Sequence, residues 1–240
     1  MDVISPVERP QAEARGSVVR TGLVRMTSGV AVNAALLFLA AGTLDWPAAW
    51  VLLGLQTAAI LFNLVMLSAH NPGLIASRTR FTRGSPAWDR AIDLLMTAGF
   101  LGTYLAAGLA RRFETGAIPD PVAPVVGAGL TVAGYALFAW AMHTNRFFTR
   151  MVRIQTERGH TVVDGGPYRF VRHPGYVGVI AYTLGAALLL GYAWALIPAG
   201  LGAAAVMART AKEDRFLHRE LDGYAEYAAR VRRRLAPGVW

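Results

Sequence analysis

MTSGVAVNAALLFLAAGTLDWPAAWVLLGLQTAAILFNLVMLSA, residues 26–69, contains a single charged residue, Asp45. A hydrocarbon core about 30 Å thick requires about 20 predominantly apolar residues for each helical crossing. The length of this stretch therefore predicts two transmembrane helices, at residues 26–44 and 48–69, joined by a tight turn around Asp45.

Three more apolar stretches follow the same pattern. Residues 91–110 and 122–142 each predict one crossing. Residues 175–208 are too many for one straight crossing and suffice for two short ones, broken near residues 191–198. The expected fold is therefore an all-α polytopic membrane protein with about six transmembrane helices, the last two forming a short helical hairpin.

The composition supports this class. Hydrophobic residues make up 54% of the chain and charged residues 16%, against about 25% charged in soluble domains. The absence of cysteine excludes a disulfide scaffold, and the high apolar content excludes a disordered chain. The net charge of +9 comes from basic residues beside the apolar stretches, which is typical of cytoplasmic loops. We therefore expect membrane lipids as partners and no nucleic acid.

The charge distribution also predicts the topology. The loop at residues 145–174 has six arginines against Glu157 and Asp164, which places it in the cytosol, whereas the charges of residues 111–121 nearly cancel. An even number of crossings then places both termini in the cytosol. We expect an integral protein of the cell (inner) membrane, with the cytosolic side carrying any polar cofactor site.

Three regions follow from these boundaries: a cytosolic N-terminal tail at 1–25, a four-helix transmembrane region at 26–144, and a catalytic region at 145–240. Within the last, residues 209–240 are charged. Apolar side chains alternate there with Arg and Glu, which predicts an amphipathic tail helix on the cytosolic side: Phe216, Leu217, Leu221, Tyr224, Tyr227 and Val231.

The first polar cluster is QTERGHTVVDGGPYRFVRHPGYVG, residues 155–178. His173 followed by Pro174 fits a helix entrance, because proline is tolerated in the first turn. Free amides at such an entrance attract a carboxylate, and the ring of Tyr176 offers a π-face to a cation or to adenine. Gly175 and Gly178 allow a ligand to approach the backbone closely.

The second cluster is Arg209 and Glu213, four residues apart at the cytosolic end of the sixth expected span. Residues at this spacing project from one face of a helix. Together they form a zwitterionic edge at the membrane surface.

Simpler interpretations exist for each cluster taken alone. His173 can be a helix cap, and Arg209 with Glu213 can be an ordinary surface pair. Tyr168, Tyr176, Tyr224 and Tyr227 can be interfacial belt residues. The five histidines are scattered and cysteine is absent, so no metal is expected.

The order and spacing of these motifs resemble the isoprenylcysteine carboxyl methyltransferase family of integral-membrane, S-adenosylmethionine-dependent enzymes. The resemblance covers residues 145–240. It rests on these elements: His160-Thr-Val-Val163, Gly-Pro-Tyr168, Arg-His173-Pro174-Gly-Tyr176-Val-Gly178, Arg209-Thr-x-x-Glu213-Asp214 and Tyr224-x-x-Tyr227. The paired Glu of the family's last motif is Glu213-Asp214 here.

The resemblance implies S-adenosylmethionine as the cofactor and a substrate-facing role for Arg209, which would orient the acceptor. The residues that it implies for cofactor binding are Gln155, His160, Thr161, Val162, Val163, Tyr168, His173, Pro174, Gly175, Tyr176 and Glu213. The implied acceptor is a lipophilic small molecule or lipidated group carrying a carboxylate or thiol.

Three functions stay open at this point. The first is a membrane methyltransferase of this kind, with direct in-line transfer to a carboxylate or thiolate. The second is a phospholipid-amine methyltransferase or a sterol-type membrane reductase, since both classes carry similar His-Pro strings. The third is a non-catalytic membrane scaffold, which predicts no cofactor binding.

Overall fold

The computed structural model describes residues 27–70 and 86–236, and this part of the chain is helical, without a β-strand. The all-α prediction is therefore confirmed. The expected N-terminal tail at 1–25 and most of the loop between the second and third spans lie outside the described residues.

The helices occupy the apolar stretches. A helical segment at Thr27–Ala41 is followed by α2 (Pro47–His70), α4 (Ala87–Arg112), α5 (Val122–Thr144), α6 (Pro174–Leu190), α7 (Leu196–Glu220) and α8 (Tyr224–Arg230). Short 3₁₀ turns lie at Thr156–Arg158, Gly166–Arg169 and Ala193–Ala195. The long polar loop thus runs between α5 and α6 with little regular structure.

Four of the described helices are long and apolar enough to cross a membrane, in the regions Pro47–Met66, Ala87–Arg112, Val122–Thr144 and Ala193–Glu220. The segment Thr27–Ala41 and α6 are shorter apolar helices. At 1.5 Å per residue the 17 residues of α6 extend about 26 Å. The count of six full crossings therefore stays a prediction.

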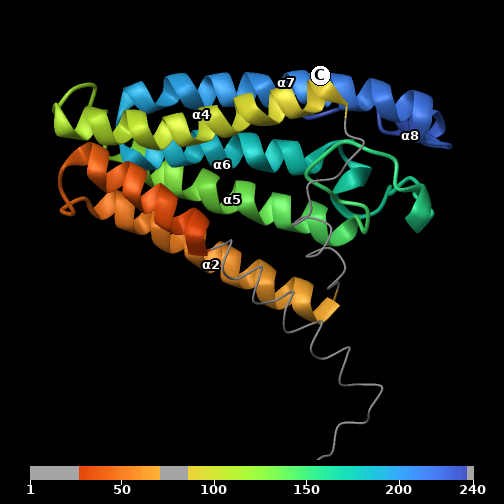
Figure 1. Ribbon diagram of the computed structural model, residues 1–240, viewed down its shortest axis with the longest axis horizontal. Coiled ribbons are helices and arrows are strands. Elements are labelled where there is room, and N and C mark those ends of the chain that lie inside the picture. Colours follow the sequence, from red (N-terminus) through yellow and green to blue (C-terminus); the bar gives the residue numbers. More distant parts are fainter. Residues whose placement is uncertain (1–26, 71–85, 237–240) are drawn as a thin grey trace, which may run out of the picture.

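The helices lie side by side in layers (Figure 1): α4 and α7 on one side, α5 and α6 in the middle, and α2 on the other side. The closest packing joins α5 to α6 and α4 to α7. Glycine permits the first of these contacts, since a Cβ atom at Gly178 would lie 2.5 Å from the backbone oxygen of Gly134. Small residues at an interface let membrane helices approach closely.

The C-terminal region differs from the single amphipathic tail helix that we expected. Helix α7 continues through the expected boundary at residue 208 to Glu220, and the chain then turns at Gly223, whose φ is +78°. Glycine adopts this left-handed conformation without the steric cost of a side chain. The short helix α8 that follows folds back over the polar loop.

The apolar residues of the tail pack against the protein's own loop. Leu221, Tyr224 and Tyr227 form a buried cluster with Tyr168 and Ala141. Because Tyr224 is 4% and Tyr227 2% exposed, the interpretation of these two as belt residues at the lipid surface is wrong. Their burial closes the end of the helix bundle at which the polar loop lies.

Candidate functional site

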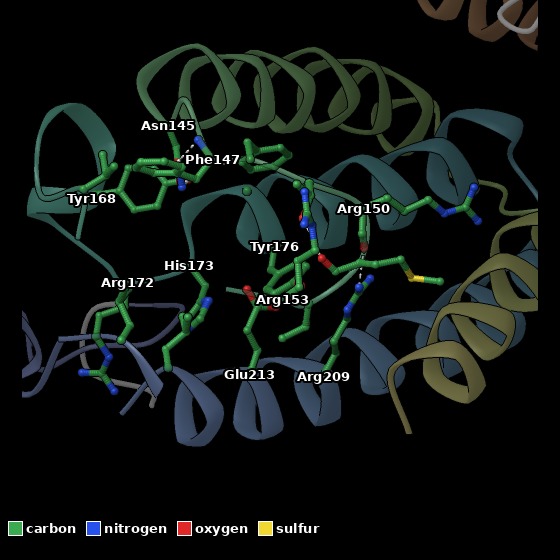
Figure 2. A pocket seen from close by; sticks show the side chains of 18 of the residues that line it. Asn145, Phe147, Arg150, Arg153, Tyr168, Arg172, His173, Tyr176, Arg209 and Glu213 are labelled. Carbon is green, nitrogen blue, oxygen red and sulfur yellow. Dashed lines mark hydrogen bonds between the residues drawn. The ribbon is translucent and has the colours of Figure 1, made fainter. Parts of the chain in front are cut away.

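A cavity of about 430 Å³ lies where the polar loop, the start of α6, the middle of α7 and α8 meet (Figure 2). It brings together ten of the twelve residues predicted for the site: His160, Thr161, Val162, Val163, Tyr168, His173, Gly175, Tyr176, Arg209 and Glu213. Gln155 and Pro174 do not line it. The two polar clusters, which are separate in sequence, therefore line one continuous cavity.

Tyr176 occupies the centre of this arrangement. Its hydroxyl donates a hydrogen bond to the carboxylate of Glu213, and the Arg209 guanidinium carbon lies 5.8 Å from the centre of its ring. Figure 2 shows Arg209 and Glu213 projecting from the same face of α7 toward it. The i,i+4 spacing on α7 and the first turn of α6 thus produce a π-face between a cation and an anion.

The ion-pair partner of Arg209 lies on another helix. Glu213 was one candidate partner from the sequence, but Arg209 Nη2 forms an ion pair with Asp89 Oδ1 at 2.8 Å. The same nitrogen donates to the backbone carbonyl of Arg150. Asp89 belongs to the first turn of α4, far away in sequence, so local spacing could not reveal it.

Gln155 supports the loop from inside and has no surface on the cavity. It is fully buried; its Nε2 donates to the Phe147 carbonyl at 2.6 Å, and its Oε1 accepts from Arg158 Nη1 at 2.8 Å. Both ends of the amide are therefore engaged within the loop. A cofactor contact at Gln155 stays a prediction without support from this geometry.

His160 is held as a neutral imidazole. Its Nδ1 accepts the backbone N–H of Gln155 at 3.3 Å, and its ring centre lies 4.4 Å from that of Phe147, with the two planes tilted by 36°. Burial, together with the positive charges of Arg153 and Arg158, lowers the pKa of His160 below its ordinary value. The ring therefore presents an uncharged aromatic surface to the cavity.

The hydroxyl of Tyr168 makes its hydrogen bonds within the protein. Its oxygen accepts from Asn145 Nδ2 at 3.3 Å and lies 3.4 Å from the carbonyl of Ala141, and burial raises the pKa of the phenol. The Tyr227 hydroxyl donates to the Tyr168 carbonyl at 2.8 Å. Tyr168 thus contributes a neutral ring to the wall and provides no base.

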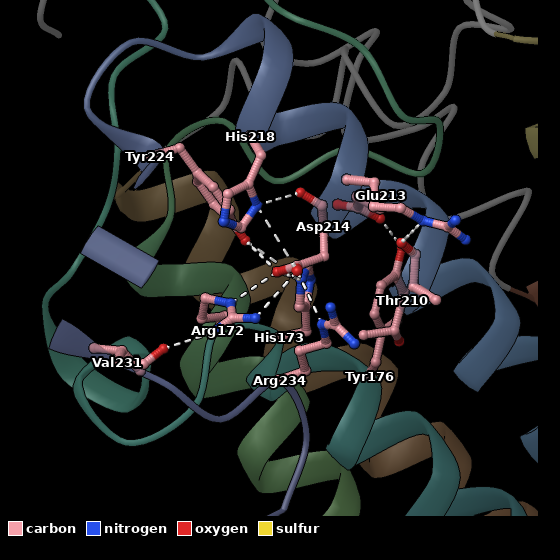
Figure 3. A network of polar contacts seen from close by, with 12 residues as sticks. Arg172, His173, Tyr176, Thr210, Glu213, Asp214, His218, Tyr224, Val231 and Arg234 are labelled. Carbon is pink, nitrogen blue, oxygen red and sulfur yellow. Dashed lines mark hydrogen bonds and ion pairs between the residues drawn. The ribbon is translucent and has the colours of Figure 1, made fainter. Parts of the chain in front are cut away.

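Asp214 is a buried acceptor that sequence reasoning had noted only as a departure from the family's motif. It is 1% exposed and lies among several donors (Figure 3). Arg172 approaches it with Nε at 2.7 Å and Nη2 at 3.1 Å, and further contacts come from Arg234 Nε at 2.9 Å, the Tyr224 hydroxyl at 2.9 Å and His173 Nε2 at 3.3 Å.

This cluster ties the end of the chain to the His-Pro element. The backbone N–H groups of Arg172 and His173 donate to the carbonyls of Arg233 and Arg234, each at 2.9 Å. The hydrogen bonds to Asp214 keep the pKa of the Arg172 guanidinium raised despite its burial. His173 is thereby fixed at the cavity edge, with its ring stacked at 5.8 Å on that of Tyr176.

A second, apolar cavity of about 240 Å³ lies deeper among the membrane helices. It shares Phe138 and Val179 with the first. Its other lining residues come from α2, α4, α5 and α6: Gln56, Ala59, Ile60, Phe100, Tyr135, Gly178, Tyr182 and Thr183. The polar site therefore adjoins an apolar space between the helices.

Among the residues described, no three His, Asp or Glu side chains are grouped in a way that could hold a metal ion. The polar side chains at the site include arginines, phenols and the imidazoles of His160 and His173. The arrangement suits an uncharged aromatic or cationic ligand beside an anionic one.

Residues 127–219 match the model of the isoprenylcysteine carboxyl methyltransferase (ICMT) family. This segment is therefore similar to that family. It extends from the first turns of α5 almost to the end of α7 and includes most of the residues that line the cavity. The resemblance seen in the motifs is thus confirmed by the comparison.

Individual relatives carry matching descriptions. A protein of Oryza sativa subsp. indica described as a probable protein-S-isoprenylcysteine O-methyltransferase is 29% identical over 109 residues, which cover 44% of this chain and 57% of the relative. The protein-S-isoprenylcysteine O-methyltransferase of Schizosaccharomyces pombe is 28% identical over 129 residues, 47% of this chain and 55% of the relative. That of Saccharomyces cerevisiae is 36% identical over 67 residues, 28% of each chain.

The chain thus spans little more than half the length of the relatives from rice and fission yeast.

Proposed function

We propose that the protein is a membrane methyltransferase that moves a methyl group from S-adenosylmethionine to a carboxylate on a lipophilic acceptor. The observation that carries the proposal is one cavity in which Tyr176 lies between Glu213 and Arg209, within the segment that matches the family. The cavity joins a polar loop on one side to an apolar space on the other.

The residues fit the cofactor. A volume of about 430 Å³ lies within the range of small-molecule sites, roughly 300–1,000 Å³. The neutral rings of Phe147, His160 and Tyr168 suit an adenine, and Glu213 suits a ribose or ammonium group. The buried Nε of Arg153 has no hydrogen-bond partner among the described residues, and it can receive the cofactor's carboxylate.

The acceptor is an anion with an apolar tail. Arg209 is 3% exposed and lines the cavity, so its guanidinium would meet a carboxylate away from bulk water. The apolar cavity between α2, α4, α5 and α6 offers space to a hydrocarbon chain that arrives laterally from the lipid. A lipidated thiol or a small lipophilic acid shares this chemistry.

The reaction requires alignment more than proton transfer. When bound, S-adenosylmethionine would supply a methyl group on a sulfonium; transfer to a carboxylate oxygen would form a C–O bond and break the C–S bond, with no proton moved. Arg209 orients the acceptor, the ring of Tyr176 faces the cation, and the loop and α8 exclude water. Proximity of this kind supplies several kcal/mol.

Two measurements on the purified protein test the proposal. Calorimetric titration with S-adenosylhomocysteine should show one saturable site. Incubation with methyl-labelled S-adenosylmethionine and N-acetyl-S-farnesylcysteine should give a base-labile methyl ester. Absence of binding favours a scaffold or a reductase, and label in phospholipid headgroups favours an amine methyltransferase; either result overturns the proposal.

We further propose that the loop at residues 145–174 and both termini are cytosolic, because the arginines concentrate there. Thr156 is exposed in this loop and the chain has no cysteine, so Thr156→Cys introduces a single label site. A membrane-impermeant thiol reagent should label it only after cells are opened. Labelling of intact cells would reverse the topology.

A further inference from the structure

Asp89 is fully buried at the start of α4, and its two carboxylate oxygens face different donors. Oδ1 pairs with Arg209 Nη2 at 2.8 Å. Oδ2 accepts the backbone N–H of Val152 at 2.8 Å. One side chain therefore contacts both α7 and the loop that forms the cavity wall.

We propose that Asp89 is a positioning residue, which fixes the Arg209 guanidinium at the cavity wall in the orientation that receives the acceptor's carboxylate. The inference rests on the proposed function and adds a residue from outside the segment that matches the family, since that segment begins at residue 127. Asp89 itself does not line the cavity, so it acts through Arg209.

The argument begins with the burial of Arg209. A guanidinium on a long flexible side chain loses much rotamer freedom when it is held in one place, and without a counter-ion its charge is costly to bury. Asp89 supplies the closest anion, while Asp93 Oδ1 is 3.8 Å from Nη1 and is already engaged by Arg150 at 3.0 and 2.9 Å. Asp89 is thus the carboxylate dedicated to Arg209.

The pairing leaves part of the guanidinium for a ligand. Nη2 of Arg209 forms the ion pair with Asp89 and donates a hydrogen bond to the Arg150 carbonyl. The buried Nε of Arg209 has no hydrogen-bond partner among the described residues. A cation that is held mainly through Nη2 and has no hydrogen-bond partner at Nε is prepared for an incoming oxygen before that oxygen arrives.

The contact with Val152 makes a carboxylate necessary. Val152 and its neighbours Arg150 and Arg153 belong to the loop that lines the cavity. An amide at position 89 has one oxygen and one NH₂ group, so the NH₂ group would face either the Arg209 cation or the Val152 N–H, where Asp89 has an oxygen. Asp89→Asn therefore preserves the size of the side chain but removes either the ion pair with Arg209 or the hydrogen bond from the Val152 N–H.

The decisive experiment compares binding of N-acetyl-S-farnesylcysteine with binding of its primary carboxamide, both in the presence of S-adenosylhomocysteine. The wild-type protein should prefer the carboxylate by at least about tenfold, as expected for hydrogen bonds to a charged group. Asp89→Asn should reduce this preference to about threefold or less and leave the affinity for S-adenosylhomocysteine within about threefold. The matched control is Asp164→Asn, which removes an exposed pair with Arg230 and should retain the wild-type preference.

A double-mutant cycle keeps the inference testable if the single Asn variant does not fold. Asp89→Asn combined with Arg209→Gln contains no unpaired buried charge, and its rate of methyl transfer should equal that of Arg209→Gln alone within about threefold, because Asp89 acts through Arg209. A further loss of about tenfold or more would show an independent role and overturn the proposal. A folded Asp89→Asn protein that prefers the carboxylate probe over the carboxamide as strongly as the wild type does would also overturn the proposal.

These outcomes are separate from failure of the proposed function. Wild-type protein that binds neither S-adenosylhomocysteine nor the farnesylated probe contradicts the function itself. Wild-type protein that binds and methylates the probe, with an unchanged Asp89→Asn variant, contradicts only the role of Asp89.

Discussion

Two buried Arg–Asp pairs meet at α7, and they differ in how far their hydrogen-bonding groups are satisfied. Arg172 with Asp214 and Arg209 with Asp89 have similar N–O distances of 2.7 and 2.8 Å, and all four side chains are at most 6% exposed. Asp214 receives donors from several elements. In the other pair, the buried Arg209 Nε and Asp89 Oδ1 have no hydrogen-bond partner among the described residues, although Oδ1 lies in the ion pair. A saturated pair holds the fold, and an unsaturated pair is prepared for a ligand.

The largest expected effect concerns the saturated pair. Asp214→Ala leaves the buried Arg172 without its counter-ion, and such a loss typically costs about 3–5 kcal/mol. The thermal unfolding temperature in detergent should therefore fall strongly, and Asp222→Ala, an exposed acid just beyond α7, should leave it unchanged. A folded variant with the wild-type unfolding temperature would remove the distinction between the two pairs.

The next effect concerns the unsaturated pair. Arg209→Lys keeps the charge and loses the planar two-point contact with a carboxylate, so methyl transfer should fall about 10- to 100-fold. The affinity for S-adenosylhomocysteine should stay within a few-fold, as a titration can measure. Parallel loss of cofactor binding would place Arg209 in the cofactor site.

A smaller effect is expected one helical turn further along α7. Glu213→Ala removes the acceptor of the Tyr176 hydroxyl, and it should weaken binding of S-adenosylhomocysteine about tenfold, in line with loss of a hydrogen bond to a charged group. Glu220→Ala is the control, because Glu220 is exposed at the end of the same helix. Unchanged affinity in the folded Glu213 variant would exclude Glu213 from the cofactor site.

The smallest effect depends on pH. Since burial and two neighbouring arginines lower the pKa of His160, the folded protein favours the neutral ring. Between this lowered pKa and the ordinary value of about 6.5 the unfolded chain binds more protons, so stability falls as the pH decreases through that window.

Protonation at Nδ1 also removes the acceptor for the Gln155 N–H. Affinity for S-adenosylhomocysteine should therefore decrease a few-fold as the pH falls below the ordinary histidine pKa of about 6.5 and through the lowered pKa of His160. His160→Asn offers an amide oxygen near the position of Nδ1 and cannot titrate in this range, so its profile should be flat. An equally steep profile in this variant would assign the pH dependence to another group.

The sequence predicted those parts of the site that follow local rules. A proline in the first helical turn placed Tyr176 at the start of α6, and the four-residue spacing placed Arg209 and Glu213 on one face of α7. Both rules act within a few residues, and the geometry agrees with them.

Partners that are distant in sequence could not be predicted in this way. Asp89 and Arg209 lie in helices whose pairing only the folded bundle determines, and the available signal was a lone acid beside arginines at the start of an apolar helix. Asp214 looked like a minor variation of a motif because its donors come from separate elements. The tail was expected as one helix because apolar periodicity does not report a turn at a residue such as Gly223.

The contact of α5 with α6 has a consequence for the precision of the site. With Gly134 facing Gly178 the two backbones touch directly, and no flexible side chain between them can absorb a displacement. Tyr176 precedes Gly178 by two residues on α6, so this direct backbone contact with α5 fixes the position of the Tyr176 ring. Changes in membrane thickness or in the surface loops would therefore move α5 and α6 together. The alignment of the reacting groups would then depend little on motions of the surrounding lipid.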